Sequence, residues 1–326
     1  MSIVYLDQNK WIELARAAKY PAQHPIASEI LTRLFDGVAA GTITVPLTFA
    51  NMYETQKIND SRQRHELAFL QASLSKGLVF RGRFKRLEIE LSDFVRSAYG
   101  LPAEVRVTSW FLSDIFFEAV AEAGDSRILS VPERVVSLIK RRPAALLYDY
   151  LMNTPEDVRR YAVVQFSEGA ERLRQRIEAR RARDGNESLA MRRRIYSAIM
   201  MVDDMDFILS CGLAAGAPWR SISDMGSSLA RRMIVDVPAY YVEREITLRL
   251  ESQNRPIDEN DFRDMQAFGA VMPYADYVVA ENQFSNLAMQ ARLGKKYNTA
   301  ISTDIRSLEK LFAGTSGPER SPVAAS

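Results

Sequence analysis

The sequence predicts an α/β protein with a parallel sheet, interrupted by a mostly α-helical insertion. Short apolar runs that end in an acid lie near both ends of the chain, and helical spacing of apolar residues follows them. Between these two parts, helical spacing continues almost without a break. The expected divisions are an α/β part over 1–86, a helical insertion over 87–255, a second α/β part over 256–313, and a disordered tail over 314–326 that is rich in Gly, Pro and Ser.

The first predicted strand carries the first candidate site residue. The apolar run 3–6 ends at Asp7, and the helically spaced positions Trp11, Ile12 and Leu14 follow at once. Ligands of open α/β sheets bind beyond the carboxyl ends of the strands, so Asp7 is a candidate ligand-binding residue. An Asp before a helix also serves as an N-cap, and both interpretations stay open at this point.

The next segment supplies a second acid. Residues 42–46 are rich in β-branched side chains and end at Pro46, which predicts a short strand. Thr48 is a candidate N-cap for a helix that carries Glu54. The order of strands and helices implies parallel pairing, which places Glu54 near the same sheet edge as Asp7. The alternative for Glu54 is a solvated position on a surface helix.

The C-terminal part places further acids in the same way. Residues 261–270 predict a helix that contains Asp264, residues 276–282 a strand that ends at Glu281, and residues 299–304 a strand that ends at Asp304. Carboxylates gathered at one edge repel one another, and a bound cation relieves this repulsion. Oxygen ligands favour Mg²⁺ or Mn²⁺, and such ions activate water for phosphodiester cleavage.

The order of these acids resembles the PIN domain, a family of metal-dependent nucleases, most of them ribonucleases, with a small parallel α/β/α sandwich. The matching segments are 5–9, 48–54 and 264–281, so the resemblance covers roughly the first 80 and the last 60 residues. The helical insertion has no counterpart in it. The resemblance implies that four acids bind the metal and position the attacking water: Asp7, Glu54, Asp264 and Glu281. The supporting polar residues would be Asn9, Asn282, Thr303 and Asp304.

The register of the later acids has two alternatives. In the preferred alignment Asp264 is the third acid and Glu281 is the fourth. In the other alignment Asp276 is third and Asp304 is fourth. The first is preferred because Asp276 begins its predicted strand and would lie at the far end from the site. The family usually has Thr and Asp near the fourth position, where this chain has Ala280, Glu281 and Asn282.

The insertion contains an Arg-rich segment between residues 172 and 194. Arginines along one helix face can follow a phosphate backbone. The candidate nucleic-acid contacts are Arg176, Arg180, Arg183 and Arg193. The alternative is a solvated helical hairpin whose arginines pair with neighbouring acids.

Composition narrows the remaining choices. The 43 basic and 41 acidic residues give a net charge of +2, which by itself does not indicate nucleic-acid binding. Two His and one Cys disfavour a His/Cys zinc site and His-based catalysis. The single Cys favours a reducing compartment, and no apolar run approaches the roughly 20 residues of a membrane span. We therefore expect a cytoplasmic protein with no membrane segment.

The predicted function is a Mg²⁺- or Mn²⁺-dependent endoribonuclease that hydrolyses RNA phosphodiester bonds. The first alternative is a catalytically degenerate module of the same fold that binds RNA or, through its helical insertion, a protein partner. The second is a hydrolase of small phosphorylated molecules that uses the same ion. Occupancy of the acids by metal and a panel of substrates distinguish these alternatives.

Overall fold

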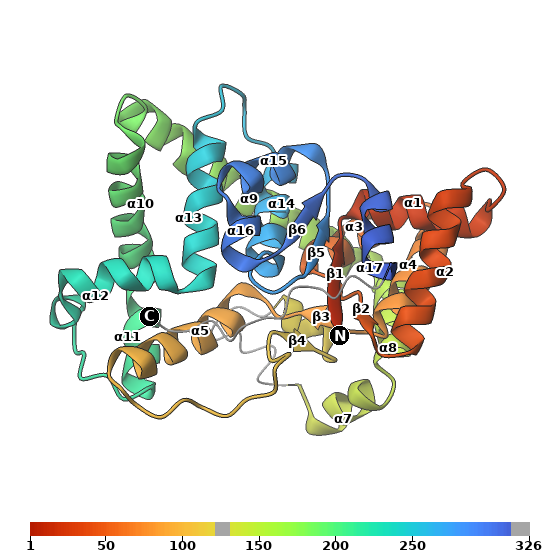
Figure 1. Ribbon diagram of the computed structural model, residues 1–326, viewed down its shortest axis with the longest axis horizontal. Coiled ribbons are helices and arrows are strands. Elements are labelled where there is room, and N and C mark those ends of the chain that lie inside the picture. Colours follow the sequence, from red (N-terminus) through yellow and green to blue (C-terminus); the bar gives the residue numbers. More distant parts are fainter. Residues whose placement is uncertain (121–130, 314–326) are drawn as a thin grey trace.

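A four-stranded parallel sheet lies at the centre of the computed structural model, which describes residues 1–120 and 131–313 (Figure 1). The predicted tail 314–326 lies outside the described residues. The strands pair in the order β2-β1-β5-β6, with all pairs parallel. Their bounds are β1 (Ser2–Leu6), β2 (Ile43–Thr44), β5 (Tyr277–Val279) and β6 (Ala300–Ser302). Each overlaps a strand that the sequence predicts, so the mixed α/β class is confirmed.

Helices cover both faces of the sheet, because the side chains of β1 alternate between two cores. Val4 and Leu6 pack in a core with α1, α2 and α4, whereas Ile3 and Tyr5 pack in a core with α14 and α15. Figure 1 shows the two groups of helices on either side of β1. Their bounds are α1 (Gln8–Lys19), α2 (Pro25–Ala39), α4 (Ser61–Ser75), α14 (Glu259–Val271) and α15 (Asn282–Gln290).

The strand register brings the ends of β1 and β5 level. Leu6 lies opposite Val279, and Val279 lies opposite Ser302 on the next strand. The backbone N–H of Asp7 donates to the carbonyl of Val279 at 3.0 Å, which continues the pairing one residue beyond β1. Residues that come directly after β1 and β5 therefore emerge side by side at one edge of the sheet.

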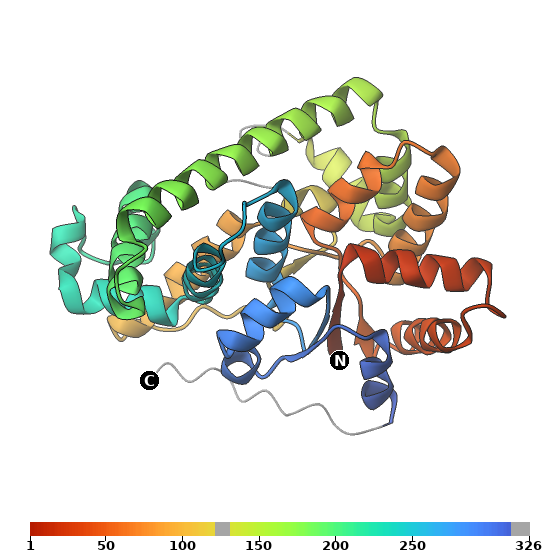
Figure 2. The same cartoon turned by 90° about the horizontal axis from the view of Figure 1, so that it is seen from above.

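The middle of the chain is mostly helical, and it packs on both the N-terminal and the C-terminal α/β parts: α8 contacts α4, and α9 and α13 contact α14. Helix α9 is 29 residues long and runs along the molecule (Figure 2). Helix α13 contacts α5, α10, α12, α14 and α15. The bounds in this part are α5 (Arg83–Ala98), α7 (Glu133–Arg141), α8 (Pro143–Asn153), α9 (Glu156–Asp184), α10 (Leu189–Asp203), α11 (Met205–Ala214), α12 (Ile222–Asp236) and α13 (Pro238–Glu251).

The predicted helical insertion is not uniformly helical, which corrects the expectation for its first part. Strand β3 (Val79–Phe80) pairs antiparallel with β4 (Leu112–Ser113), and a short 3₁₀ helix, η1 (Phe116–Ala119), comes next. Phe111 precedes β4, and its ring stacks on Tyr274 with centroids 4.3 Å apart. Short apolar runs do not distinguish strand from helix by spacing alone, and here the strand is accompanied by packing of aromatic rings from distant segments.

The remaining elements complete the core and join the helical part to it. Phe166 of α9 packs against Tyr53 of α3 and Phe262 of α14, with ring centroids 4.5 and 4.9 Å apart. None of the helices in residues 1–120 and 131–313 has the length and apolar character that crossing a membrane requires. The last bounds are α3 (Phe49–Lys57), α16 (Leu293–Tyr297), η2 (Ile305–Leu308) and α17 (Glu309–Phe312).

Candidate active site

Asp7 links the end of β1 to the end of β5. Its Oδ1 accepts a hydrogen bond from the backbone N–H of Gln8 at 2.8 Å, so the side chain caps α1. Its Oδ2 accepts from the backbone N–H of Glu281 at 3.3 Å. Capping and membership of a site, which the sequence left as alternatives, are therefore compatible, since each carboxylate oxygen has its own partner.

Glu281 stands beside Asp7 because β5 ends level with β1. It occupies the N-cap position of α15, and its side chain is exposed. Asn9, in the first turn of α1, donates a hydrogen bond from Nδ2 to Glu281 Oε1. Asn9 therefore lies beside Glu281, and its supporting role stays a prediction. Asn282 is the exposed first residue of α15 and lies next to Glu281 in the chain.

Glu54 is positioned by the start of α3. Thr48 and Asn51 form a reciprocal capping box there, which fixes where the helix begins. Asn51 Nδ2 also donates to the carbonyl of Leu6 at 3.3 Å, which ties α3 to the last residue of β1. The sequence prediction of Thr48 as N-cap is confirmed, and the helix carries Glu54 to the edge where Asp7 lies.

A buried triangle of polar side chains holds α3 against its neighbours. Gln8 Nε2 donates to Thr55 Oγ1 at 3.0 Å, Thr55 Oγ1 donates to Gln71 Oε1 at 2.8 Å, and Gln71 Nε2 donates back to Gln8 Oε1 at 3.2 Å. The three residues come from α1, α3 and α4. Thr55 is the residue directly after Glu54, so this triangle also fixes the helix turn that carries the acid.

Asp264 reaches the site from α14, which packs against α3. Asp258 and Asp261 form the capping box that begins this helix. Tyr5 of β1 is 1% exposed and lies close enough to Asp264 and Asp7 for their charges to raise the pKa of its hydroxyl, in addition to the larger effect of burial. Tyr5 therefore stays protonated beside the acids.

The acids Asp7, Glu54, Asp264 and Glu281, which we call the acid cluster, interact electrostatically. Burial first, and then the charges of Asp7 and Glu54, raise the pKa of Asp264 to about 8. Burial also raises the pKa of Glu54 to about 7, with Arg263 opposing the rise and Asp7 and Glu281 adding to it. Burial raises the pKa of Asp7, and partial desolvation followed by the charge of Asp7 raises the pKa of the more exposed Glu281. Carboxylates from four segments of the chain thus lie close enough to repel one another.

Arg263 is the cation that acts on all four acids, and no sequence pattern singles it out. Its Nε lies 3.1 Å from Glu54 Oε1, and its Nη1 lies 3.7 Å from Glu259. Its charge lowers the pKa of Asp7, Glu54, Asp264 and Glu281 alike. The only signal in the sequence is its position directly before Asp264, which does not reveal which acid it pairs with.

Glu259 connects the cluster to the helical part of the chain. Its carboxylate accepts from Lys57 at 2.7 Å, from Ser167 of α9 at 3.0 Å and from Tyr53 at 3.3 Å. Arg263 contacts it from the same helix. The insertion therefore touches the wall of the site rather than lying apart from it.

The acids of the other register lie elsewhere. Asp276 Oδ2 accepts from the backbone N–H of Ile3 at 2.7 Å, which is the start of β1 and the opposite edge of the sheet. Asp304 is exposed, and its carboxylate accepts from the backbone N–H of Arg306 at 2.9 Å to cap η2. Thr303 connects β6 to that turn. The structure thus gathers Asp264 and Glu281 with Asp7, and leaves Asp276 apart from them.

The four arginines proposed for nucleic-acid contact each face an acid. Arg176 lies 3.5 Å from Asp203, Arg183 lies 2.7 Å from Asp184, and Arg193 lies 2.8 Å from Glu245. The buried Arg180 pairs with Glu251. The arginines are paired, as in the alternative that the sequence offered, but Arg180 is buried rather than solvated, and Arg180 and Arg193 pair with acids of α13 rather than with acids of the hairpin.

The donor chemistry of the acid cluster suits a hard divalent ion, because carboxylate and amide oxygens are its only ligand atoms. Over residues 1–120 and 131–313, no three His, Cys, Asp or Glu side chains lie close enough to hold a metal ion as they stand. Glu54 is directed to Arg263 instead. Binding an ion would require Glu54 to exchange this ion pair for the metal.

Comparison with protein-family models, with curated proteins and with solved structures finds no match for this chain. Its function is therefore inferred from the residues of the acid cluster and from the elements that position them.

Proposed function

We propose that the chain is a Mg²⁺- or Mn²⁺-dependent endoribonuclease with a PIN-like α/β/α core and a helical insertion. The observation that supports this best is the acid cluster. Four carboxylates from the β1–α1 junction, α3, α14 and the β5–α15 junction lie near one another. Burial raises the pKa of each, and the charge of Asp7 raises the pKa values of Glu54, Asp264 and Glu281 further. Such repulsion destabilises the metal-free fold, and acids with perturbed pKa values are typical of functional sites.

The ion would be held by Asp7, Glu54, Asp264 and Glu281, with Asn9 fixing Glu281. A bound Mg²⁺ or Mn²⁺ supplies an activated water and stabilises the charge that develops at the phosphate. In the metal-free protein, Asp264 retains a proton at neutral pH because its pKa is about 8. Tyr5 keeps its hydroxyl proton beside the acids, so it adds no further negative charge to them.

The decisive experiment is cleavage of RNA by wild type and by Asp7→Asn in buffers with Mg²⁺, Mn²⁺ or a chelator. We expect cleavage by wild type with metal only, and its loss in Asp7→Asn, whose amide oxygen still caps α1. Asp304→Asn is the matched control, because it caps η2 outside the cluster. Equal cleavage by wild type and Asp7→Asn would refute the mechanism, and loss of cleavage in Asp304→Asn would favour the other register.

The Glu54–Arg263 ion pair favours a second candidate function, a degenerate module that binds RNA or a protein partner without cleavage. In this case Arg263 would be the permanent counter-ion of the acid cluster. Calorimetric titration with Mn²⁺ separates the two. Binding that is lost in Asp264→Asn supports the nuclease, whereas no binding to wild type supports the module.

The single cysteine, Cys211, is free and buried, which supports the cytoplasm as the compartment.

A further inference from the structure

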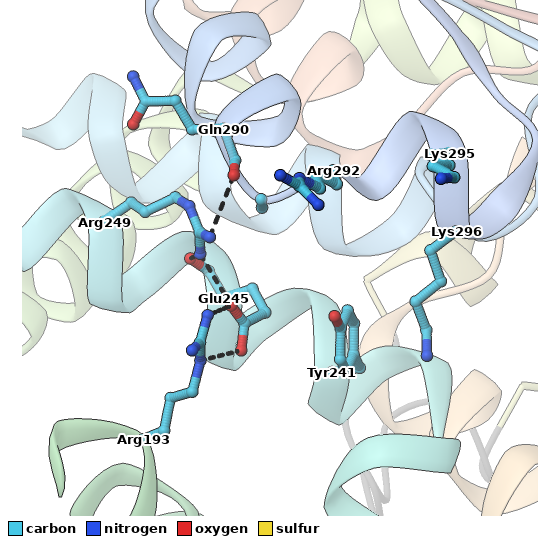
Figure 3. Close-up of a pocket in the computed structure, with 9 residues that line it drawn as sticks. Arg193, Tyr241, Glu245, Arg249, Gln290, Arg292, Lys295 and Lys296 are labelled. Atoms are coloured by element: carbon cyan, nitrogen blue, oxygen red, sulfur yellow. Dashed lines mark hydrogen bonds and ion pairs between the residues drawn. The ribbon is translucent and has the colours of Figure 1, made fainter. Parts of the chain in front are cut away.

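A basic pocket lies on the helical side of the molecule, between α10, α13 and the α15–α16 segment (Figure 3). Its volume is about 540 Å³, within the range of pockets that hold small ligands or parts of larger ones. Five cationic side chains and one carboxylate line it: Arg193, Arg249, Arg292, Lys295, Lys296 and Glu245.

Glu245 fixes the deeper wall of this pocket. Its side chain is 2% exposed, and Arg193 and Arg249 each approach it at 2.8 Å. Burial raises the pKa of Glu245, but the hydrogen bonds from these two arginines and the charge of Arg244 outweigh burial and lower the pKa to about 2. Arg249 also donates to the carbonyl of Gln290 at 3.2 Å, which joins α13 to the end of α15. The wall is therefore rigid and carries an excess of positive charge.

Among the residues that the structure describes, no ion pair within 4.0 Å involves the other cations of the pocket, although the charges of Asp236 and Glu245 act on Lys296. Lys296 Nζ lies 3.9 Å from the centre of the Tyr241 ring and donates to the carbonyl of Val235 at 3.3 Å. Neither Arg292 nor Lys295 takes part in an ion pair within 1–120 and 131–313, and both side chains are exposed. An anion that entered the pocket would meet these two groups first.

The pocket and the acid cluster lie at opposite ends of the same helix. Helix α15 begins directly after Glu281 and ends at Gln290, which lines the pocket. Its nine residues make it about 13 Å long at a rise of about 1.5 Å per residue. A chain of phosphates that ran along α15 would thus meet both the pocket and the proposed metal site.

We propose that this pocket binds phosphate groups of a polynucleotide, with Arg292 and Lys295 as the contacting residues. The RNA assignment rests on the proposed nuclease function, whereas the phosphate chemistry comes from the lining alone. One wall of the pocket carries Arg193 and Arg249. The side chains of Arg292 and Lys295, which differ in length, take part in no ion pair among the described residues. Helix α15 sets the distance between the pocket and the acid cluster. These features suit backbone phosphates, which position a nucleic acid without reading its sequence.

The test is binding of a short fluorescein-labelled single-stranded RNA, measured by anisotropy in a chelator with Asp7→Asn as the background that prevents cleavage. Each phosphate contact contributes about 0.7 to the slope of log K against log salt for single strands. We expect Arg292→Gln/Lys295→Gln to weaken binding and to reduce this slope by about 1.4. The matched control is Arg134→Gln/Lys140→Gln, which removes one exposed Arg and one exposed Lys from α7.

Equal RNA affinity and equal slope in the pocket variant and the α7 control would overturn the inference. Weaker RNA binding in the pocket variant supports it, whether or not wild type cleaves RNA, so the failure of the nuclease proposal remains a separate result. Inorganic phosphate and a mononucleotide form a third arm, measured by calorimetry. If either binds in the pocket while RNA does not, the pocket serves a small phosphorylated ligand and the polynucleotide assignment is wrong.

Discussion

Replacing Asp264 by Asn should make the metal-free protein more stable above about pH 4, because the folded protein must either keep a proton on Asp264 or bear its buried charge, and Asn requires neither. The pKa of Asp264 is about 8 in the folded protein, against 3.8 for an ordinary Asp side chain. The folded state therefore binds more protons than the unfolded state between about pH 4 and pH 8, and the free energy of unfolding falls as pH rises through this window. Asn carries no charge at any pH and escapes this loss.

The size of the effect comes from the pKa shift. One pKa unit corresponds to about 1.4 kcal/mol, so the full shift sets an upper bound of about 6 kcal/mol at pH 8. Asp7 and Glu54 share the repulsion and titrate together with Asp264, so we expect a gain of about 2–4 kcal/mol. Below about pH 4 the carboxyl group is protonated in both states, and the gain should vanish.

Urea unfolding of wild type and Asp264→Asn across this pH range measures the effect directly. Asp304→Asn is the control, because its exposed carboxylate caps η2 outside the cluster, and we expect no comparable gain at any pH. Adding Mn²⁺ should stabilise wild type by about 2.7 kcal/mol at a hundredfold excess over Kd and should have little effect on Asp264→Asn. A variant that is no more stable than wild type at pH 8, or a gain independent of pH, would refute the electrostatic account.

Three further perturbations test other parts of the site. Gln71→Ala leaves its buried partners Thr55 and Gln8 with unmade hydrogen bonds, so urea unfolding should show a free energy of unfolding about 1–3 kcal/mol lower. The control Gln63→Ala changes an exposed residue, and its free energy of unfolding should stay within about 0.5 kcal/mol of wild type. Protons on Asp264 and Glu54, with pKa values of about 8 and 7, compete with metal. Calorimetry should therefore show Mn²⁺ affinity falling at least about tenfold from pH 8 to pH 6, and an unchanged affinity would contradict this competition. Arg263→Gln frees Glu54 from its ion pair, so Mn²⁺ should bind more tightly while the metal-free protein loses stability at pH 8; weaker Mn²⁺ binding would show that Arg263 supports the ion.

The sheet and the positions of Asp7 and Glu54 could be predicted because the sequence patterns that indicate them lie within short segments of the chain. The run that ends at Asp7 has the length and composition of a buried strand, and parallel strands deliver the residues after them to one edge of the sheet. Glu54 could be placed because Thr48 marks the start of its helix. The choice of Asp264 over Asp276 rested on the position of Asp276 at the start of its strand, where the structure places it.

Features that depend on distant partners could not be predicted. Arg263 looks like any helical arginine until α3 packs beside α14 and brings Glu54 within 3.1 Å. Strand β4 lies in a segment of apolar spacing that also fits a helix, and stacking of Phe111 on Tyr274 accompanies the strand. The basic pocket combines Arg193 with residues of α13 and α16, which no local pattern relates.

The pairing of β1 with β5 also bears on how the protein folds during synthesis. The hydrogen bond between Ile3 and Asp276 spans 273 positions, a very non-local contact. At about 5–20 residues per second, a ribosome needs roughly 15–50 s to make the intervening chain. During that interval one edge of β1 has no partner strand, and Asp7 and Glu54 exist without Asp264 and Glu281. The acid cluster can assemble only after the chain has been made as far as Glu281.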